Sequence, residues 1–553
     1  MPARMPLPHD FQALILCGPG VSFNTFTSTP EDFPKALIPV ANRPMIWYPL
    51  DWCRRANITR ITLITPTTSC KAIEDALSRN PHLTSPELPR PDVLAPSGLS
   101  QNTGTAEILR LPDVQTIITG HFLILPCDLL CDLPGERLLE TWMIHAAGMV
   151  GSSAAAGGLG VWYPTKSELA VKGEETNFLT TAQLPHATVP SSPESLRPNL
   201  SEVVYSSTTD TLNDITESQK SFPVRHGLLR KHGKIRMLTT TRDAHIYLFP
   251  YWTLDFINQN PKFDSISEDV VGWWAKATWQ DGLVPKLGLE QIFNPPSSQA
   301  KGNSDANQSH NEIDQDIDIT SMSTTHISNL LTPPPTPQSP SSSTNTKSPK
   351  PKTAIPPFLC YLHPTSSSIS SSSSSSPPQQ QTLIRRVDTT PLLLTLSLHL
   401  ASLASPSPLA TKQKIHPTTT IAPRTTISAS DVLIGANTTV NQFTTIKNSV
   451  VGANCVIGPN VRLTRCVIMD DVEVGERCQL TGCVVGWRSK VGKGCKLGEG
   501  SEVAPGYAVE EGVEGAGELL GGFEGLEEDV GSGEEEEEED QDMEGDDTAA
   551  DDA

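Results

Sequence analysis

The sequence has few charged and few aromatic residues for its length. Of the 553 residues, 19% are charged and 5% are aromatic, which is low for a chain that folds throughout. Long apolar runs are also missing: the longest candidate, residues 391–404, is interrupted by polar side chains. Residues 1–10 contain no apolar stretch of the kind that signal peptides carry. We therefore expect no membrane span and a cytosolic protein.

Cysteine is present, but not at the spacing of a zinc site. The eleven cysteines include no C-x-x-C pair, and we expect reduced thiols and no bound metal. In the C-terminal part of the chain, Cys466 and Cys483 are 17 residues apart, as are Cys478 and Cys495. This spacing predicts that they stack in a repeat as small packing residues.

Two segments have compositions that do not favour a packed core. Residues 296–382 are rich in Ser, Pro, Thr, Asn and Gln, and we interpret them as a disordered linker. Residues 510–553 hold 21 acidic residues and neither Lys nor Arg, so most of the net charge of −22 lies there. We interpret residues 509–553 as a solvated, disordered acidic tail. The alternative is electrostatic docking to a basic partner, which would be sensitive to salt.

The N-terminal half alternates short apolar runs with helical stretches. Residues 11–295 show this pattern, which predicts an α/β domain with a Rossmann-like sheet. Residues 13–17, 60–65 and 121–126 read as buried strands. The first of them runs into a glycine-bearing loop, the place where such sheets commonly bind phosphate.

Beyond a connecting helical segment at residues 383–420, a repeat begins. Apolar residues recur mostly every six positions from Ile421 to Val503, and glycine often follows them. This hexapeptide pattern predicts a left-handed parallel β-helix over residues 421–508, with four to five coils. A β-helix acyltransferase needs a catalytic histidine, and none occurs from Thr418 onward. We therefore favour an assembly platform over that enzyme.

The loop after the first predicted strand is similar to the signature of sugar nucleotidyltransferases, A-G-G-x-G-T-R-L followed by P-K-x-L-x-P-V. The second half is present as Pro34, Lys35, Leu37, Pro39 and Val40.

The first half of that signature is degenerate. Pro19 stands at its second glycine and lacks an N–H for phosphate. Val21 places a β-branched side chain where the backbone should approach a ligand. Phe23 replaces the arginine that would grip a triphosphate. We expect this loop to keep the shape of a nucleotide site without its chemistry.

The resemblance implies a remnant nucleotide-binding pocket with no catalytic residue and no cofactor. In that family a Gly-Thr-Ala segment, here beginning at Gly104, faces the base and ribose, and an aspartate at the position of Asp128 holds Mg²⁺. Other interpretations remain open: Lys35 as a solvated side chain, Asp128 as a helix N-cap, and Gly104-Thr105 as a helix start. The candidate pocket residues are Gly18, Gly20, Lys35, Gly104, Thr105 and Asp128.

The whole ordered chain resembles the gamma-type subunits of the eukaryotic translation initiation factor 2B family. The stretches that carry the resemblance are FPKALIPVANRPMIWYPLDW, GLLRKHGKIRMLTTTRDAHIYLFPYWTLDF, RRVDTTPLLL and the hexapeptide repeat. Epsilon-type subunits share the first two domains and add a helical-repeat domain with exchange activity. Because this sequence ends in acidic residues instead, we favour the gamma type.

This resemblance implies a non-catalytic core subunit of the guanine nucleotide exchange factor complex that replaces GDP by GTP on initiation factor 2. The implied partners are the epsilon subunit and the other subunits of factor 2B, with factor 2 as the substrate of the complex. No membrane and no direct nucleic-acid contact is expected. The alternatives are a mannose-1-phosphate guanylyltransferase and a regulatory or sugar-nucleotide-sensing subunit of such an enzyme.

Overall fold

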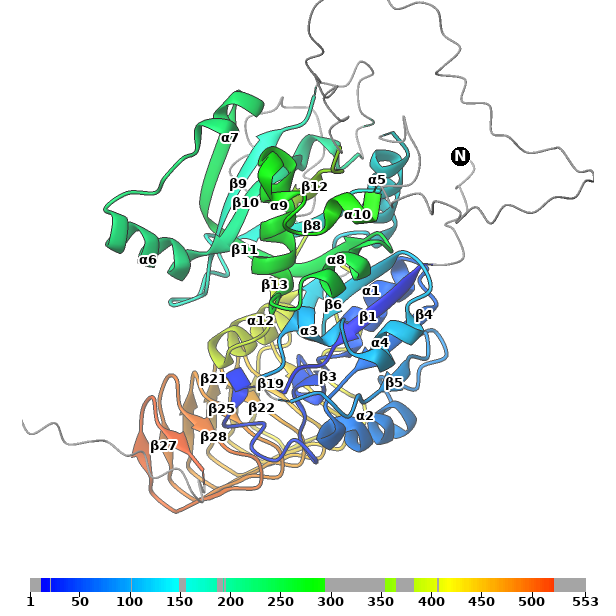
Figure 1. The fold of residues 1–553 in the computed structure, drawn as a ribbon. Helices are drawn as coiled ribbons and strands as arrows, with labels where there is room; N and C mark the ends of the chain where they lie inside the picture. The colour runs from blue at the N-terminus through cyan, green and yellow to red at the C-terminus, as the bar shows by residue number, and fades with distance from the viewer. Residues whose placement is uncertain are drawn as a thin grey trace, which may run out of the picture. The chain divides into compact units, whose positions relative to one another are not determined.

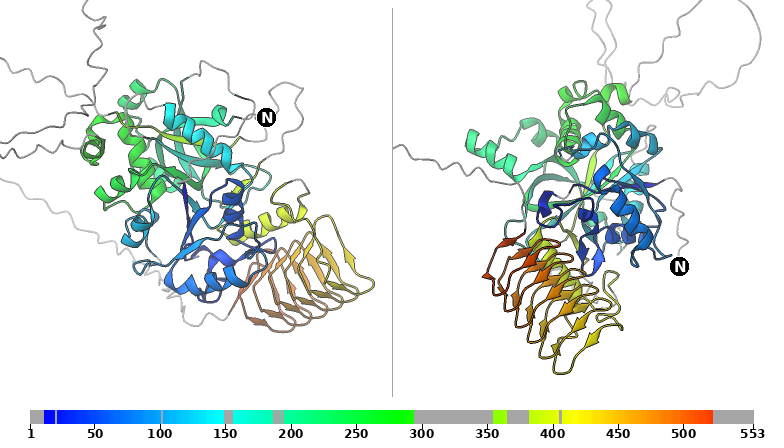
Figure 2. Two further views of the ribbon diagram at one scale, coloured as in Figure 1. Left: turned by 90° about the vertical axis from the view of Figure 1, so that its right-hand side faces the viewer. Right: turned by 90° about the horizontal axis from the view of Figure 1, so that it is seen from below.

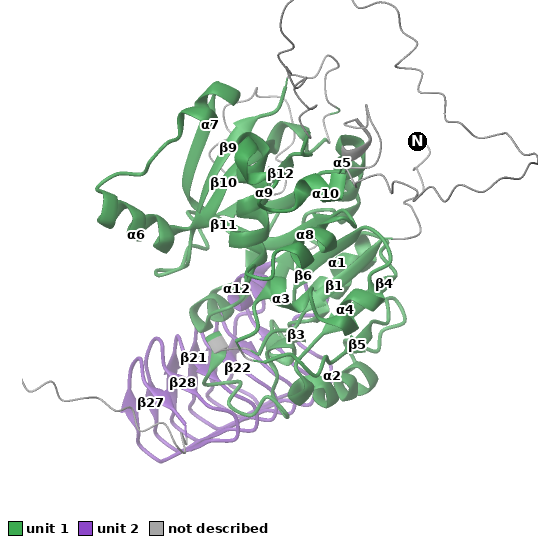
Figure 3. Cartoon of the chain, viewed as in Figure 1, with its two compact units in different colours: residues 1–396, 405–409 green, residues 397–404, 410–553 purple. Residues whose placement is uncertain are grey.

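The structure is a computed structural model, and it divides the chain into two compact units (Figure 3). Unit 1 comprises residues 1–396 and 405–409, and unit 2 comprises residues 397–404 and 410–553. The residues that the structure describes are 11–19, 21–100, 102–148, 156–185, 192, 195–293, 354–364, 382–404 and 407–521.

Unit 1 is built on a nine-stranded mixed sheet with the order β5-β4-β1-β6-β11-β8-β12-β10-β9 (Figure 1). The first four strands in this order pair in parallel, and β11 runs antiparallel to β6. This is the mixed α/β, Rossmann-like sheet that the alternation of strands and helices predicts. The strands are β1 (Gln12–Leu16), β4 (Arg60–Ile64), β5 (Asp92–Leu94), β6 (Phe122–Pro126), β8 (Gly158–Pro164), β9 (Asn177–Gln183), β10 (Leu200–Thr208), β11 (Ile235–Phe249) and β12 (Phe358–Leu362).

Strand β12 corrects the expectation that residues 296–382 form only a linker. Its five residues pair in parallel with β8, and three of them pair antiparallel with β10, so the strand lies in the interior of the sheet. The Ser- and Pro-rich flanks concealed this short apolar run, FLCYL, in the sequence. Most of the remaining predicted linker, and the predicted tail from residue 522, lie outside the described residues.

Helices cover both faces of the sheet. All five residues of β6 are buried, as expected for a strand that packs on both sides. The main α-helices are α1 (Trp47–Arg55), α2 (Thr67–Arg79), α3 (Thr105–Ile108), α4 (Pro112–Ile117), α5 (Gly135–Gly148), α6 (Thr209–Gln219), α7 (His226–Lys231), α8 (Thr253–Gln259), α9 (Val271–Trp279), α10 (Leu289–Phe293) and α12 (Thr390–Ser402).

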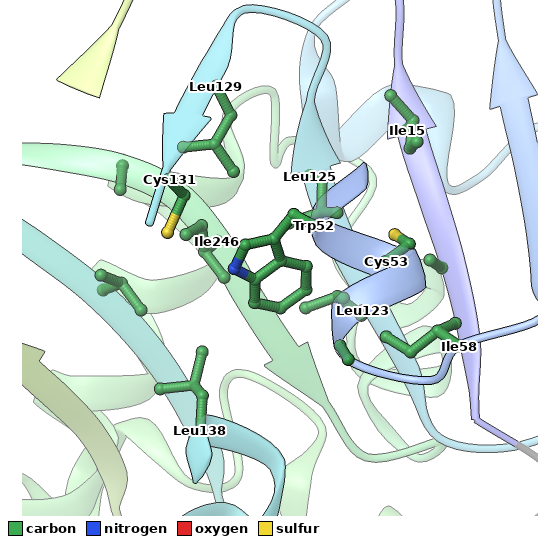
Figure 4. Close-up of a cluster of buried hydrophobic side chains, with 14 of the residues drawn as sticks. Ile15, Trp52, Cys53, Ile58, Leu123, Leu125, Leu129, Cys131, Leu138 and Ile246 are labelled. Carbon is green, nitrogen blue, oxygen red and sulfur yellow. The ribbon is translucent and has the colours of Figure 1, made fainter. Parts of the chain in front are cut away.

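The residues of β6 alternate between two apolar cores. Leu123 and Leu125 belong to the core on one face, where Trp52 packs among aliphatic side chains (Figure 4). The Trp52 indole also donates a 2.9 Å hydrogen bond to the Leu133 carbonyl oxygen. Phe122 and Ile124 belong to an aromatic-rich core on the opposite face. No helix in the described part of the chain combines the length and apolar character that a membrane crossing needs.

Short elements connect the main strands and helices. They are η1 (Val21–Phe23), η2 (Lys35–Leu37), β2 (Pro39–Val40), β3 (Arg43–Pro44), β7 (Leu129–Cys131), η3 (Arg197–Asn199), η4 (Ile266–Val270), η5 (Asp281–Leu283) and β13 (Ile384–Arg386).

Unit 2 contains a parallel β-helix, as the hexapeptide repeat predicts. Three parallel sheets of six strands each line its sides, so the described chain forms six coils rather than four to five (Figure 2). The strands are β14 (Thr420–Ile421), β15 (Thr426–Ile427), β16 (Leu433–Ile434), β17 (Thr439–Val440), β18 (Thr445–Lys447), β19 (Val450–Val451), β20 (Val456–Ile457), β21 (Arg462–Thr464), β22 (Val467–Ile468), β23 (Glu473–Val474), β24 (Gln479–Thr481), β25 (Val484–Val485), β26 (Lys490–Val491), β27 (Lys496–Leu497), β28 (Glu502–Val503), β29 (Ala508–Val509), β30 (Glu514–Gly515) and β31 (Leu519–Leu520).

The interior of the β-helix is a column of aliphatic and cysteine side chains. Cys466 and Cys483 lie on adjacent coils with their Sγ atoms 3.6 Å apart, which confirms the stacking that their spacing predicts. Both side chains are fully buried, and all eleven cysteines are free thiols. The register between coils is regular: Leu463 pairs with Ile446 on one side and Leu480 on the other.

Candidate functional site

The candidate site lies at the carboxyl ends of two adjacent parallel strands of unit 1. Leu16, the last residue of β1, is opposite Pro126, the last residue of β6. The chain continues from these strands into Gly18 and Asp128, so two of the predicted pocket residues share one edge of the sheet. Ligands of open α/β sheets bind at this edge.

Asp128 makes ion pairs with two cationic side chains of unit 1. Arg386 donates two hydrogen bonds of 3.0 Å, from Nε to Oδ1 and from Nη2 to Oδ2. Lys35 Nζ lies 2.7 Å from Oδ2. The aspartate side chain is 1% exposed. Burial by itself would raise the pKa of Asp128, but Arg386 and Lys35 outweigh it and hold that pKa far below its usual value.

Arg386 reaches Asp128 through a strand pairing between distant parts of the sequence. Strand β13 pairs antiparallel with β7, which sets Arg386 opposite Leu129. The next backbone N–H, of Val387, donates a 2.8 Å hydrogen bond to the Asp128 carbonyl oxygen. The RRVD stretch after the predicted linker thus supplies a counterion to the site. Sequence reasoning missed this role, because 258 residues separate the two partners.

Lys35 is not a solvated lysine, which corrects one of the interpretations left open. Its side chain is 11% exposed, and its Nζ lies 5.8 Å from the centroid of the Phe23 ring. Burial lowers the pKa of Lys35, but the Asp128 carboxylate more than compensates, so the net shift is upward. The charged amine is therefore held between a carboxylate and an aromatic face.

Phe23 is the residue that stands in place of the expected arginine. It is 1% exposed, and its carbonyl oxygen accepts hydrogen bonds from the N–H groups of Phe26 and Thr27 at 2.8 and 2.9 Å. The loop after β1 is therefore stabilised by its own turns and an apolar anchor. Gly18 is exposed, and a Cβ there would meet nothing within 4 Å. Gly20 lies outside the described residues.

Gly104 and Thr105 pack against a turn of their own domain. A Cβ on Gly104 would lie 1.8 Å from Asp264 Oδ1 and 2.4 Å from the Asp264 carbonyl oxygen, so this close approach requires glycine. The Thr105 hydroxyl accepts a 2.9 Å hydrogen bond from the Ile266 N–H. Ala106 N–H donates to the Asp264 carbonyl oxygen at 2.8 Å. These contacts agree with a helix start, the simpler of the two interpretations.

A second buried ion cluster adjoins the first through the same segment. Arg385 Nη1 lies 3.3 Å from Glu174 Oε1, and Arg242 Nη1 lies 3.5 Å from the same oxygen. Arg242 also pairs with Asp388. Burial raises the pKa of Glu174, and the two arginines offset only part of that rise. Neither Arg242 nor Glu174 was singled out from the sequence, since nothing local marks them as partners.

The arrangement around Asp128 does not fit a magnesium ion. Mg²⁺ binds in such sites through carboxylate oxygens that remain free to bridge to phosphate. Here three charge-assisted hydrogen bonds occupy both oxygens of Asp128. Separating a buried ion pair commonly costs about 3–5 kcal/mol, which a metal would have to offset. Among the described residues, no group of three His, Cys, Asp or Glu side chains could hold a metal.

The fold and the site define a class of protein: a nucleotidyltransferase-like domain with an internally neutralised carboxylate, followed by a left-handed β-helix. Residues 409–514 match the family model of the eIF2B subunit epsilon LbH domain. The chain is also 25% identical, over 296 residues, to the translation initiation factor eIF2B subunit gamma of Schizosaccharomyces pombe. That match covers 53% of this chain and 57% of the relative, so the chain spans about half the length of the curated relative. By both comparisons the chain is similar to subunits of eIF2B.

Proposed function

We propose that this chain is a non-catalytic, gamma-type core subunit of the complex that exchanges GDP for GTP on translation initiation factor 2. In this role it supports an epsilon subunit in the cytosol, and unit 1 serves as a structural surface rather than an enzyme. The similarity to a gamma subunit supports the choice of type. The family model that matches the β-helix is that of an epsilon subunit, but it covers only the β-helix domain. In our proposal, gamma-type and epsilon-type subunits both contain this domain.

One observation carries the non-catalytic part of the proposal: Asp128 is neutralised from within the chain. An acid that served as a metal ligand would keep an oxygen accessible to the ion and substrate. Asp128 instead contacts Arg386 through both oxygens and Lys35 through one. The lysine that would bind a phosphate is engaged in the same contact. The Asp128 carboxylate and the Lys35 amine are therefore both occupied by contacts within the folded chain.

The candidate pocket residues fit the same proposal. Phe23 fills the position of a phosphate-binding cation with an apolar ring. The backbone around Gly104 and Thr105 bonds to the Asp264–Ile266 turn. A domain with this arrangement keeps its fold through buried ion pairs and packing, and it leaves its outer surfaces for association.

An enzymatic assay tests the non-catalytic part. We expect the purified full chain to release no pyrophosphate from GTP and mannose-1-phosphate in the presence of Mg²⁺ beyond the rate of its Asp128→Ala variant. The opposite result would be pyrophosphate release by the full chain that is lost in the Asp128→Ala variant, with circular dichroism showing that the variant still folds. That result would identify the chain as a mannose-1-phosphate guanylyltransferase and refute our proposal.

Co-purification tests the assembly part. We expect a tagged full chain, recovered from its own cells, to bring down an epsilon subunit and further subunits of the exchange factor, identified by mass spectrometry. The complex should accelerate GDP release from initiation factor 2, whereas the chain purified alone should not. A stable monomer that recovers no exchange-factor subunit would contradict the assembly role, whatever the enzymatic assay shows.

A further inference from the structure

Two thiols of unit 1, Cys17 and Cys127, lie at the carboxyl ends of adjacent strands, and the proposed function gives them no role. Strands β1 and β6 pair in parallel as far as Leu16 opposite Pro126, and the two cysteines are the next residues. The Cys127 N–H donates a 3.1 Å hydrogen bond to the Leu16 carbonyl oxygen, so the contact between the strands continues to this position. The two cysteines are therefore neighbours across the strand pair.

Both thiols point to the same face of the sheet. Side chains alternate between the two faces along a strand, and Ile15 and Leu125, two residues before the cysteines, lie in the same apolar core as they do (Figure 4). Neighbouring strands are about 4.8 Å apart, and the Cα atoms of a disulfide are usually about 4.4–6.8 Å apart. Each of the two thiols also shifts the pKa of the other. The strand pairing therefore places them at a spacing that a disulfide can bridge.

Cys127 is the more acidic thiol of the pair. Hydrogen bonding by Cys17, together with the nearby cations Lys35 and Arg386, holds the pKa of Cys127 below its ordinary value, although burial and a neighbouring carboxylate oppose this. In the other described cysteines of unit 1 the pKa is raised. Burial raises the pKa of Cys131, for example, to about 12. Because cysteines react as thiolates, and cations beside the sulfur favour that form, we expect Cys127 to react first.

The pair lies at the boundary of the apolar core. Cys17 is 3% exposed and Cys127 is 2% exposed, which is too little for a bulky reagent in the folded chain. The next residue, Gly18, is exposed, and a Cβ there would meet nothing within 4 Å. The thiols are therefore one residue away from solvent. Hydrogen peroxide is only slightly larger than water, so a small local opening beside Gly18 suffices to admit it.

We propose that Cys17 and Cys127 form a site of reversible oxidation, at which hydrogen peroxide converts the two thiols to a disulfide. The Cys127 thiolate attacks one peroxide oxygen and the O–O bond breaks. The leaving hydroxide takes up the proton that Cys127 released, so water and a sulfenic acid result. The Cys17 sulfur then attacks the Cys127 sulfur, the S–S bond forms, and the hydroxyl group leaves with the Cys17 proton as a second water. The thiols lose two electrons, which the peroxide gains.

Thiol reductants reverse this oxidation by exchange, so the disulfide is transient wherever the surroundings are reducing. It would link the ends of β1 and β6 directly beside Asp128, the carboxylate of the candidate site. The inference does not depend on the proposed subunit role, because it follows from the strand pairing and the charges around one thiol.

The β-helix provides a matched thiol pair within the same chain. Cys466 and Cys483 lie on adjacent coils with their Sγ atoms 3.6 Å apart, and both are 0% exposed inside the packed column. Close spacing alone would let this pair form a disulfide as well. We expect it to stay reduced while the chain is folded, so that its oxidation reports unfolding.

Peroxide treatment of the folded full chain tests the proposal. After treatment, the remaining thiols are alkylated with N-ethylmaleimide in urea, and the peptides are analysed by mass spectrometry without reduction. We expect a peptide pair that is linked through Cys17 and Cys127 and that dithiothreitol separates. Cys466 and Cys483 should both carry the alkyl group.

Single substitutions separate the roles of the two cysteines. In Cys17→Ser, oxidation of Cys127 should stop at the sulfenic acid, which dimedone traps. In Cys127→Ser, Cys17 should take up little dimedone, because its pKa is raised well above the ordinary value. The control Cys53→Ser replaces another buried cysteine of the same core and should leave the link intact. Circular dichroism shows which variants fold, and the link in the unsubstituted chain tests the proposal even if a substitution unfolds unit 1.

Two results would overturn the proposal. One is alkylation of both Cys17 and Cys127 after a peroxide treatment that already oxidises the partly exposed Cys70. The other is a Cys17–Cys127 link that appears only together with a link between Cys466 and Cys483. That second result would show that the thiols oxidise in the unfolded chain and serve as packing residues in the folded one.

Discussion

The contact between Arg386 and Asp128 makes a quantitative prediction about the stability of unit 1. Replacing Arg386 with methionine keeps most of the side-chain volume but removes two of the three charge-assisted hydrogen bonds to Asp128. Removing one partner of a buried pair costs about 3–5 kcal/mol, because the other charge stays buried without compensation. Lys35 remains 2.7 Å from the same carboxylate, so we expect the lower end of this range.

A loss of about 3 kcal/mol is a large fraction of the 5–15 kcal/mol that is typical of a domain. It corresponds to a change of roughly a hundredfold or more in the unfolding equilibrium. Tryptophan fluorescence during urea denaturation reports this change for unit 1 in particular, because Trp487 is the only one of the nine tryptophans that lies in unit 2. The unfolding midpoint should shift to markedly lower urea concentration.

Two further variants show whether the loss comes from the ion pair. Arg79→Met removes an arginine whose carboxylate partner, Asp75, lies 3.7 Å away on the surface, and it should change stability by less than about 0.5 kcal/mol. Combining Arg386→Met with Asp128→Asn should destabilise by less than the sum of the two single changes. If Arg386→Met shifts the midpoint no more than Arg79→Met does, or if the two substitutions are additive, the structural role given to this pair is wrong.

Three other predictions concern acid stability, thiol reactivity and the β-helix. The pKa of Asp128 is depressed in the folded chain, so its stabilising contribution is complete above the unfolded value of about 4 and is lost as the pH falls below it; urea unfolding from pH 6 to pH 3 should show a shallower acid slope for Asp128→Asn, and an unchanged slope would count against the pair. Iodoacetamide should label Cys70 first under native conditions, because the other ten cysteines are buried; early labelling of Cys466 or Cys483, detected by mass spectrometry, would contradict the packed column. In β21, Leu463→Ala should destabilise the β-helix by about 2–5 kcal/mol, whereas the exposed neighbour Arg462→Ala should have little effect; circular dichroism melting compares the two, and equal losses would show that the register is misassigned.

Much of the fold was predictable because its signals are local. The buried strands β1, β4 and β6 lie within one residue of the stretches read from the sequence. The hexapeptide repeat predicts the β-helix, because each coil contacts mainly its neighbouring coils and has the same residue pattern as they do. Its extent was underestimated: the strands continue to Leu520, beyond the predicted end at residue 508, where glycine and glutamate replace many of the apolar residues.

The candidate site was predictable only in part. The degenerate loop and the placement of Asp128 at a strand end follow from residue types and spacing. The partners of Asp128 do not, because a side chain's counterion depends on which strands pair. The sequence allowed Lys35 to be interpreted as a solvated side chain. In the structure Lys35 is buried, because its amine contacts the Asp128 carboxylate and lies over the Phe23 ring.

By itself, the sequence determined the α/β pattern, the repeat, the loss of the phosphate-binding arginine and the concentration of acidic charge near the C-terminal end. The tertiary structure decided that β12 enters the sheet and that β13 brings Arg386 to Asp128. These outcomes come from pairings between segments far apart in the chain. The sequence of a short apolar or charged segment does not identify the distant segment with which it pairs. Burial and hydrogen bonding select that partner only in the folded chain.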